Sequence, residues 1–475
     1  MSMMEFTETL SDKLVKDIAR AAKALRTAKT ALVITHIDAD GITAGSIASI
    51  TLERMHIEHT IIFEKKITED TIHRVNTSSA DIIWICDLGS AYLSEFKKSN
   101  IIITDHHVPD PKYRKKQTFI DGFYEIHHLN PHLYGVNGSY EICGAGMTYL
   151  LSREMDPKNT DLAYLGIVGA VGDFQDDLES RLVSYNRIVL KDAIDAGDVI
   201  ADTDIRFFGR ENRPLTQFLQ YSSDPELPGI TNNATGCSNF YSELNIPLKD
   251  NGEWRTWNDL TPYEKDIATE ELRSMVSGDD KAEKHLYGEV YTLPKFESHI
   301  GLRDAKEYAT ILNSCGRYDD AETGLRICRG DLTALNDAEQ NRSDHRRNIS
   351  MALSYIKENH LIRERRFIQY FDSGSEIRET IVGIVAGMLL NSNEAKHELP
   401  IFAFAKADDG IKVSARATHN LTDKGLDLSI IMKTASEMVG GFGGGHNIAA
   451  GATIPEGKEE AFLDIVEDLV SSQVI

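Results

Sequence analysis

Acidic and imidazole side chains gather in three short segments of this 475-residue chain. The first segment contains His36, Asp38 and Asp40, the second contains Asp87, and the third contains Asp105, His106 and His107. Carboxylate oxygens and imidazole nitrogens suit hard and borderline divalent cations, whereas thiolates select softer metals. Aspartate and histidine gathered in this way, without cysteine, predict a two-metal site for a hard or borderline divalent ion.

Each of these segments follows a short apolar run rich in β-branched residues. The runs are residues 31–34, 82–85 and 101–103. Runs of this kind are typical of buried strands in a parallel sheet. Parallel strands present their carboxyl ends at one edge, and open α/β sheets bind their ligands there. We therefore expect the three segments to meet at one edge of a sheet.

A fourth acidic segment follows the apolar stretch at residues 165–171, which lies in a helical pattern. Its first carboxylate is Asp173, and Asp176 and Asp177 follow closely, so the residues alone leave open which of the three would bind a cation. A single aspartate after a strand more often caps a helix or forms a turn. The metal interpretation therefore depends on all four segments meeting at one place.

The chain is acidic, with a formal net charge of −23. This charge disfavours broad contact with nucleic acid, because phosphate binding usually needs a basic face. It does not exclude a local basic groove. Three basic clusters occur, at residues 112–116, at Arg206, Arg210 and Arg213, and at Arg363, Arg365 and Arg366. Each cluster by itself is expected to lie on a solvated surface.

Cysteine usage and hydropathy bear on the compartment. The five cysteines are scattered and form no Cys-x-x-Cys pair, which argues against a disulfide framework or a zinc ribbon. No stretch approaches the about 18 consecutive apolar residues of a membrane span. Residues 1–16 lack the apolar core of a signal peptide. We therefore expect a cytoplasmic protein.

The chain is too long for one ordinary core and divides by pattern into three regions. Residues 1–200 alternate strand-like and helix-like segments, which predicts a doubly wound parallel sheet. Residues 201–335 are turn-rich and mixed, and we expect a small inserted domain followed by the start of a connector. Residues 336–475 continue the helical connector into a second α/β domain.

The expected elements follow this division. Helical patterns occupy residues 5–28, 44–55, 69–75, 92–98, 144–153, 161–171, 260–276, 332–358 and 380–390, and strand patterns return at residues 367–371, 401–405 and 411–415. Thr261 followed by Pro262 is typical of a helix start. Residues 125–131, which contain His127 and His128, are expected to form a turn before Pro131 rather than a metal site.

The ordered set of motifs resembles the four N-terminal motifs of the DHH phosphoesterases. The matching residues are His36, Asp38, Asp40 and Gly41, then Asp87, then Asp105, His106 and His107, then Gly172 and Asp173. Residues 313–317 resemble the Asn-x-x-Gly-Arg motif of the RecJ branch, and residues 413–416 and 443–451 resemble the DHH-associated C-terminal domain. In detail, the chain is similar to archaeal RecJ-like nucleases, including the type that associates with the GINS complex. Bacterial RecJ proteins place Asp where this chain has His36, which is still a competent metal ligand.

This resemblance implies an α/β fold with an N-terminal doubly wound DHH domain, an inserted domain, a helical connector, and a C-terminal DHH-associated domain, with the active site in the interdomain cleft. It also implies two Mn²⁺ or Mg²⁺ ions. One ion would be held by His36, Asp38 and Asp87, and the other by Asp40, Asp87, His106 and Asp173, so that Asp87 bridges them. Asp105 would orient His106, and His107 would contact the scissile phosphate.

The resemblance further implies a substrate-binding set in the later part of the chain. Besides His107, the set is Asn313, Arg317, Ser414, Arg416, Gly444, Gly445 and His446. Arginine side chains clamp phosphates, and glycine-rich loops can present backbone N–H groups to them. Such a site suits a single strand, because a duplex is too wide unless it is unwound.

The function implied is a metal-dependent exonuclease that degrades single-stranded DNA or RNA to 5′-mononucleotides, in DNA replication or repair, with GINS and the replicative helicase as partners. Two alternatives stay open. The chain could be a phosphodiesterase for short oligoribonucleotides or cyclic dinucleotides, although the inserted region argues against so small an enzyme. It could also be a replisome scaffold, although complete metal motifs argue against a dead enzyme. The direction of digestion and the sugar preference stay open as well.

Overall fold

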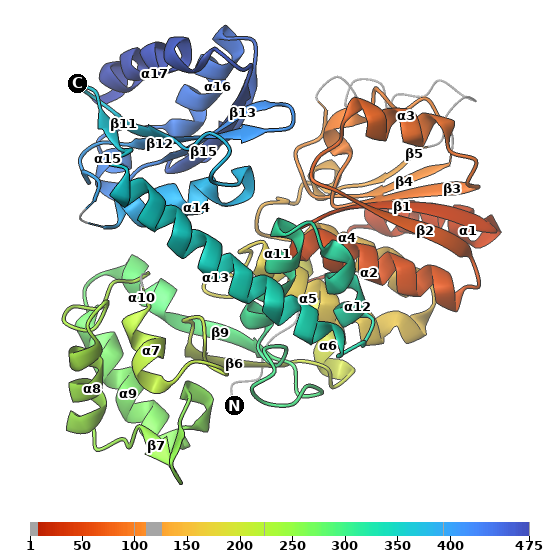
Figure 1. Ribbon diagram of the computed structural model, residues 1–475. Helices are drawn as coiled ribbons and strands as arrows, with labels where there is room; N and C mark the ends of the chain where they lie inside the picture. The colour runs from red at the N-terminus through yellow and green to blue at the C-terminus, as the bar shows by residue number, and fades with distance from the viewer. Residues whose placement is uncertain (1–7, 99, 111–125, 223, 393, 475) are drawn as a thin grey trace. The chain divides into compact units, whose positions relative to one another are not determined.

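The computed structural model describes residues 8–98, 100–110, 126–222, 224–392 and 394–474. The chain forms two compact units, Met1–Glu339 and Gln340–Ile475, and each is described by itself (Figure 1). The basic cluster at residues 112–116 lies outside the described residues. Among the helices that are described, none combines the length and the apolar character needed to cross a membrane.

A five-stranded parallel sheet forms the centre of the first unit. In chain order its strands are β1 (Thr30–His36), β2 (Glu58–Glu64), β3 (Ile82–Cys86), β4 (Ile101–Thr104) and β5 (Ile126–Leu129), and their order across the sheet is β2-β1-β3-β4-β5. All four pairings are parallel. The three strands that precede the predicted site, β1, β3 and β4, are therefore neighbours.

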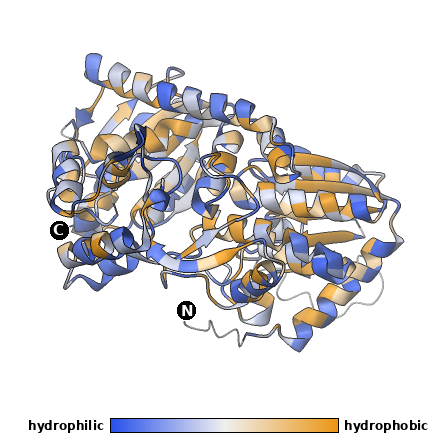
Figure 2. Cartoon of the chain, turned by 90° about the horizontal axis from the view of Figure 1, so that it is seen from below, coloured by the Kyte–Doolittle hydropathy of each residue, from blue (hydrophilic) through white to orange (hydrophobic). Residues whose placement is uncertain are grey.

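Alternate residues of these strands enter two different hydrophobic cores. Val33, Trp84 and Ile102 pack in the larger core, and their neighbours Ile34 and Ile83 pack on the opposite face. Both faces are covered, so the central residues of β1, β3 and β4 are apolar. Strands drawn mostly in orange are seen in Figure 2. The helices are α1 (Asp12–Thr27), α2 (Ala39–Arg54), α3 (Glu69–Thr77), α4 (Gly144–Met155), α5 (Ala163–Gly172) and α6 (Tyr185–Asp195). The predicted doubly wound sheet is confirmed.

Three local predictions for this unit are wrong. Helix α2 begins at Ala39 rather than at residue 44, because the side chain of Asp38 caps it by accepting the Gly41 N–H. Residues 92–98 form no α-helix and follow a short 3₁₀ turn, Ser90–Tyr92. The side chain of Asn76 bonds the backbone of this segment and holds it as a loop. Strand β5 lies where a turn was expected. The sequence did not predict this strand, because two histidines interrupt its apolar pattern.

The inserted region is bracketed by an antiparallel ribbon of β6 (Ile200–Ile205) and β9 (Tyr287–Thr292). Between them lie α7 (Leu215–Gln220), α8 (Ala234–Glu243), the β7–β8 hairpin (Lys249–Asp250 and Glu253–Trp254), α9 (Pro262–Met275) and α10 (Asp280–Leu286). These elements enclose their own core around Phe218, Tyr241 and Trp257. Thr261 and Pro262 begin α9 with a capping box, as predicted.

The chain then returns to the first core through α11 (Ala305–Arg317) and α12 (Ala321–Cys328). Tyr308, Leu312 and Ile327 are buried in that core with residues of α2 and α5. The predicted second region ran on to residue 335, but these two helices pack with the parallel sheet domain and not with the inserted core. This return places α11 against the loop that follows β1.

The second unit holds a six-stranded mixed sheet. Its strands are β10 (Arg363–Glu364), β11 (Gln369–Asp372), β12 (Ile401–Ala407), β13 (Gly410–Arg416), β14 (Phe442–Gly445) and β15 (Ala449–Ile454), in the order β10-β11-β12-β13-β15-β14. Its helices are α14 (Glu379–Leu390), α15 (His419–Asp423), α16 (Leu428–Met438) and α17 (Glu459–Val474). Helix α14 packs on one face of this sheet, and α16 and α17 pack on the other. Helix α13 (Ala334–Glu358) connects the two units along the chain, and it lies close to the helix predicted at residues 332–358.

Candidate metal centre

The carboxyl ends of β1, β3 and β4 bring the predicted ligands together. His36 ends β1, and its Nδ1 lies 2.9 Å from an Asp38 oxygen and 3.5 Å from an Asp87 oxygen. On the other side of Asp87, its second oxygen lies 3.2 Å from His106 Nε2 and 3.8 Å from His107 Nδ1. Asp87 is buried and stands in the left-handed backbone region, with φ of 55°. These distances place Asp87 between His36 on one side and the pair His106 and His107 on the other, which are the two histidine groups of the centre.

Three overlapping groups of side chains could each hold a cation. They are His36, Asp38 and Asp87; Asp87, His106 and His107; and Asp40, His106 and Asp173. Within each group the candidate ligand atoms lie within 4.8 Å of one another. The structure thus brings all six predicted metal ligands to one place, and Asp87 and His106 each belong to two groups.

Asp40 lies within the first turn of α2 and not on a loop. Its two oxygens accept the backbone N–H groups of Gly144 and Ala145 at 2.7 and 2.9 Å. These donors belong to the N-terminus of α4, which favours negative charge. Gly144 permits this approach, because a β-carbon there would lie 2.7 Å from the side chain of Asp87. Helix α4 therefore positions two of the acidic residues.

His106 is oriented by the backbone and not, as predicted, by Asp105. Its Nδ1–H donates to the carbonyl oxygen of Gly138 at 2.7 Å, which leaves Nε2 directed toward Asp87. Asp105 instead accepts from His107 Nδ1 at 2.8 Å and from the backbone N–H groups of both histidines. Asp105 therefore holds His107, whose side chain is 55% exposed.

Asp173 follows α5 and is the member of its acidic segment that faces the histidines. One of its oxygens lies 3.7 Å from His106 Nδ1. Asp176 and Asp177 point away and pair with Arg206 at 2.8 Å. Geometry thus favours Asp173 among the three carboxylates that the sequence left open.

Electrostatics keep the imidazoles charged when no cation is bound. Burial opposes the charged form of His36, but Asp38 and Asp87 outweigh it and raise its pKa to about 11. Burial likewise opposes the charge on His107, and Asp105 raises its pKa to about 9. Both rings therefore hold protons at neutral pH in the cation-free protein.

The carboxylates of the centre respond in opposite directions. Burial disfavours the charged form of Asp87, yet His106 and His36 hold its pKa well below the usual range. Burial, reinforced by repulsion from Asp87, raises the pKa of Asp40. Burial also raises the pKa of Asp173 to about 6. Divergent pKa values in one cluster of titratable groups are typical of a functional site.

Cation binding to this centre should release protons and strengthen as the pH rises. Groups with raised pKa values must lose their protons before they can act as ligands. Between pH 6 and pH 9 we therefore expect Mn²⁺ affinity to rise by about tenfold per pH unit for each proton displaced. Titration calorimetry in two buffers with different ionisation enthalpies would count the protons. Equal affinity at both ends of this range, with no proton release, would contradict the assignment.

Family profiles match three stretches of the chain. The N-terminal domain of the DHH family matches residues 30–167, the DHH-CID domain matches residues 207–284, and the DHHA1 domain matches residues 364–472. The first match contains β1, β3 and β4 with the acidic and histidine segments at their ends. Residues 30–167 thus form a DHH-family N-terminal domain, and a DHH-CID domain and a DHHA1 domain follow it.

Proteins similar to this chain match it over nearly its whole length. An uncharacterized protein of Methanocaldococcus jannaschii is 27% identical over 455 residues, which is 93% of each chain. RecJ from Thermus thermophilus, solved in complex with Mn²⁺, has a TM-score of 0.58 at 16% identity, covering 99% of this chain and 56% of RecJ. Cdc45 from Entamoeba histolytica has a TM-score of 0.61 at 11% identity, covering 97% and 98% of the two chains. This chain thus spans little more than half of the RecJ chain.

The Asn-x-x-Gly-Arg motif packs against the loop that carries the candidate ligands. Asn313 accepts the Ala39 N–H through its side-chain oxygen at 2.9 Å. Gly316 lies against the same loop, because a β-carbon there would stand 1.8 Å from the carbonyl oxygen of Ile37. Arg317 ends α11 and is exposed. The structure gives Asn313 a positioning role, and its contact with substrate stays a prediction.

The predicted phosphate-binding residues of the DHHA1 domain lie on its sheet. Ser414 and Arg416 are on β13, beside α14, where Gly383 leaves room for both side chains. Gly444 and Gly445 are on the edge strand β14. The backbone N–H of His446 was expected to face a phosphate, but it donates to the Ala449 carbonyl within the hairpin and is not available. His446 itself is exposed.

Gln175 contacts the candidate centre and was not among the predicted residues. Its amide N–H group donates to the Gly138 carbonyl at 2.8 Å and to Asp173 at 3.2 Å. Its carbonyl oxygen accepts from Asn186 at 2.7 Å. Because the same Gly138 carbonyl orients His106, Gln175 links two candidate ligands from different elements. A glutamine two residues after Asp173 carried no signal by itself.

Replacing Gln175 with leucine should weaken cation binding by about 10- to 100-fold, because groups that orient metal ligands typically contribute that much. Calorimetric titration with Mn²⁺ at constant pH would measure the change. Gln369→Leu is a matched control, because Gln369 is also buried and also donates to two carbonyls, but lies in the second unit. Wild-type affinity in Gln175→Leu would remove this positioning role.

Proposed function

We propose that this protein is a metal-dependent nuclease that hydrolyses single-stranded DNA or RNA to 5′-mononucleotides. The observation that carries the proposal is the convergence of six candidate ligands, with Asp87 between the histidine groups. Two divalent cations in such a centre would supply a nucleophilic water and neutralise charge at the phosphorus. The five cysteines, all buried free thiols, fit our proposal that it works in the cytoplasm.

The chemistry of the donor set fits Mn²⁺ or Mg²⁺. The donors are carboxylate oxygens and imidazole nitrogens, and His36, Asp38 and Asp87 would hold one ion while Asp40, Asp87, His106 and Asp173 hold the other. One oxygen of Asp87 is buried and makes no hydrogen bond of good geometry, although it lies 3.2 Å from His106. A buried acceptor in this state is costly unless a ligand satisfies it. Imidazole ligands tilt the choice toward Mn²⁺.

His107 is placed to act on the substrate. Asp105 fixes its ring and its side chain is half exposed, so it can donate a hydrogen bond to a non-bridging oxygen of the scissile phosphate. In the cation-free protein Asp105 raises the pKa of His107 to about 9 against the opposing effect of burial. We assign the other phosphate contacts to Arg317 and to the DHHA1 residues.

Arg416→Ala should weaken binding of a single strand by about 10- to 100-fold, the contribution of a charge-assisted hydrogen bond to phosphate. Fluorescence anisotropy with a chelator present would measure strand affinity without cleavage. Arg365→Ala is the control, because Arg365 lies in the same unit and pairs with Glu460 and Asp464. Unchanged affinity in Arg416→Ala would take this arginine out of the substrate site.

A digestion assay tests the function itself. Single strands of DNA and RNA, labelled at the 5′ or the 3′ end, would be incubated with the protein and Mn²⁺ or with a chelator. Cation-dependent shortening to mononucleotides is expected, and the labels give direction and sugar preference together. Cleavage of dinucleotides or cyclic dinucleotides alone would replace this proposal with that of a small-substrate phosphodiesterase.

A second role, as a binding partner in a replisome, is favoured by one observation. The DHH-CID domain has a core of its own, and the fold of the whole chain is similar to that of Cdc45. We propose the GINS complex and the replicative helicase as partners. Retention of GINS on the immobilised protein would support this, and absence of binding at micromolar concentrations would argue against it. The complete set of ligands favours an active enzyme in either case.

A further inference from the structure

A groove runs along the boundary between the DHH domain and the inserted domain. It consists of two adjoining hollows of about 680 and 1230 Å³ that share Phe174, Asp177 and His285 as lining residues. Both hollows come close to the metal centre along the chain. Ser139 follows Gly138, whose carbonyl holds His106, and Phe174 follows Asp173. Two residues that line the groove are thus direct chain neighbours of Gly138 and Asp173.

Phe174 is presented to solvent at a conformational cost. Its side chain is 68% exposed, and its backbone has φ of 57°, a region that residues with a β-carbon rarely adopt. Strain of this kind persists where the surrounding structure enforces it, most often at functional sites. Phe174 follows the candidate metal-binding residue Asp173, and its exposed, strained position is explained if its ring contacts a bound substrate.

A second aromatic surface lines the smaller hollow. Tyr221 is 53% exposed, and the guanidinium of Arg213 lies over its ring at 5.5 Å and over the ring of Phe208 at 4.7 Å. Both rings line the hollow that contains Phe174. The groove thus offers π-faces from the DHH domain and from the inserted domain.

Both basic and acidic residues line this groove. Lys306 lines the smaller hollow, and Lys281 and Lys284 line the larger one. The lining carboxylates are Asp177, Asp224 and Asp280. The first is paired with Arg206 and the second with His285. Cationic side chains interleaved with exposed aromatic rings are the pattern of surfaces that bind single-stranded nucleic acid, in which rings stack on bases and cations follow the backbone.

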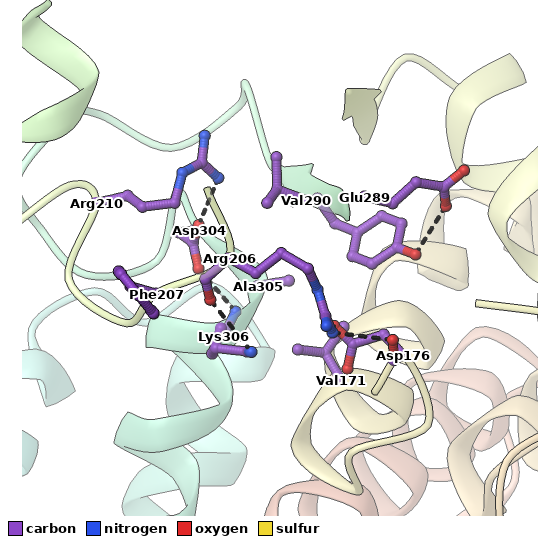
Figure 3. Close-up of a pocket in the computed structure, with 11 residues that line it drawn as sticks. Val171, Asp176, Arg206, Phe207, Arg210, Glu289, Val290, Asp304, Ala305 and Lys306 are labelled. Atoms are coloured by element: carbon purple, nitrogen blue, oxygen red, sulfur yellow. Dashed lines mark hydrogen bonds and ion pairs between the residues drawn. The ribbon is translucent and has the colours of Figure 1, made fainter. Parts of the chain in front are cut away.

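Buried ion pairs lie between the groove and the metal centre. Arg206 and Arg210 are buried, not solvated as predicted, and Figure 3 shows them reaching into ion pairs at this junction. Arg206 binds Asp176 and Asp177, and Arg210 binds Asp304 at 3.0 Å. The turn that carries Asp173 and Phe174 is thereby fixed to the inserted domain.

We propose that this groove binds unpaired bases of a single-stranded nucleic acid, with Phe174 and Tyr221 as stacking platforms. This inference rests on the proposed nuclease function and extends it by naming the path of the strand beside the metal centre. Stacking on rings makes the site tolerant of sequence, and because a stacked ring needs an unpaired base, the groove selects single strands over duplexes.

Fluorescence anisotropy on the full-length chain, with a chelator present, would test the groove. The probes are a labelled oligothymidylate and the same strand with abasic sites. Phe174→Leu and Tyr221→Leu should each weaken binding of the normal strand by about 5- to 100-fold, the contribution of stacking one base. Phe174→Trp should restore it. Tyr263→Leu is the matched control, because Tyr263 is 72% exposed in the same domain and does not line the groove.

The outcomes separate this inference from the proposed function. Wild-type binding by both leucine variants, or equal binding of the abasic strand, would overturn the groove even if the protein digests single strands. Loss of affinity confined to the groove variants would support it even if nothing is cleaved. In that second case the proposed nuclease function fails and the groove stands.

Discussion

Asp87→Asn is expected to lower metal-dependent hydrolysis by about a thousandfold or more, since it removes the carboxylate shared by two candidate ligand groups. An amide carries no charge and offers one oxygen, so neither group keeps its cation affinity. Initial rates of mononucleotide release at saturating Mn²⁺ would measure the loss. Hydrolysis at the wild-type rate by a cleanly purified variant would end the two-metal assignment.

The same variant makes a second, separable prediction for the cation-free protein. Asp87 is stabilised as a carboxylate by His36 and His106, which hold its pKa below the usual range. Its replacement should therefore lower the melting temperature in chelator, rather than raise it by relieving repulsion. Asp192→Asn is the control, because Asp192 pairs with Arg153 and accepts from Tyr149 away from the centre. That variant should lose stability without losing the rate of hydrolysis per folded molecule.

Gly316→Ala is expected to destabilise the protein and to lower hydrolysis by at least about tenfold, since the added β-carbon would lie 1.8 Å from the Ile37 carbonyl oxygen. Helix propensity alone predicts the opposite sign, a gain of about 1 kcal/mol for alanine over glycine within a helix. The contact is with backbone, which has little freedom to shift. The loop between His36 and Asp38 must move, and with it two of the ligands.

Thermal unfolding with and without Mn²⁺, together with digestion rates, would measure both effects of Gly316→Ala. Gly324→Ala is the matched control, because it lies in the neighbouring helix α12 and the nearest atoms to its β-carbon would be methyl groups, those of Ile42 at 3.1 Å. Side-chain ends can give way, so this variant should remain near wild-type stability. Equal melting temperatures and equal digestion rates of the two variants would show that the loop between His36 and Asp38 does not depend on its contact with α11.

Local pattern was enough to predict the sheet domain and its edge. The apolar runs before His36, Asp87 and Asp105 have the composition of strands buried on both faces, and β1, β3 and β4 form there. Residues directly after parallel strands must share an edge, so the meeting of the three segments followed from the strands alone. Pattern failed at β5, where His127 and His128 interrupt the apolar run. It also failed at residues 92–98, where Asn76 bonds the backbone.

The sequence by itself thus determined strands β1, β3 and β4, the order of the acidic and histidine segments, and the class of cation they could hold. Only the tertiary structure decided which hydrogen-bond partner orients each residue of the site. It assigned His106 to the Gly138 carbonyl, His107 to Asp105, and the Ala39 N–H to Asn313. It also buried Arg206 in ion pairs and left Phe174 in solvent. Periodicity reports which face of an element is apolar, whereas these contacts join residues far apart in the chain and depend on how whole elements pack.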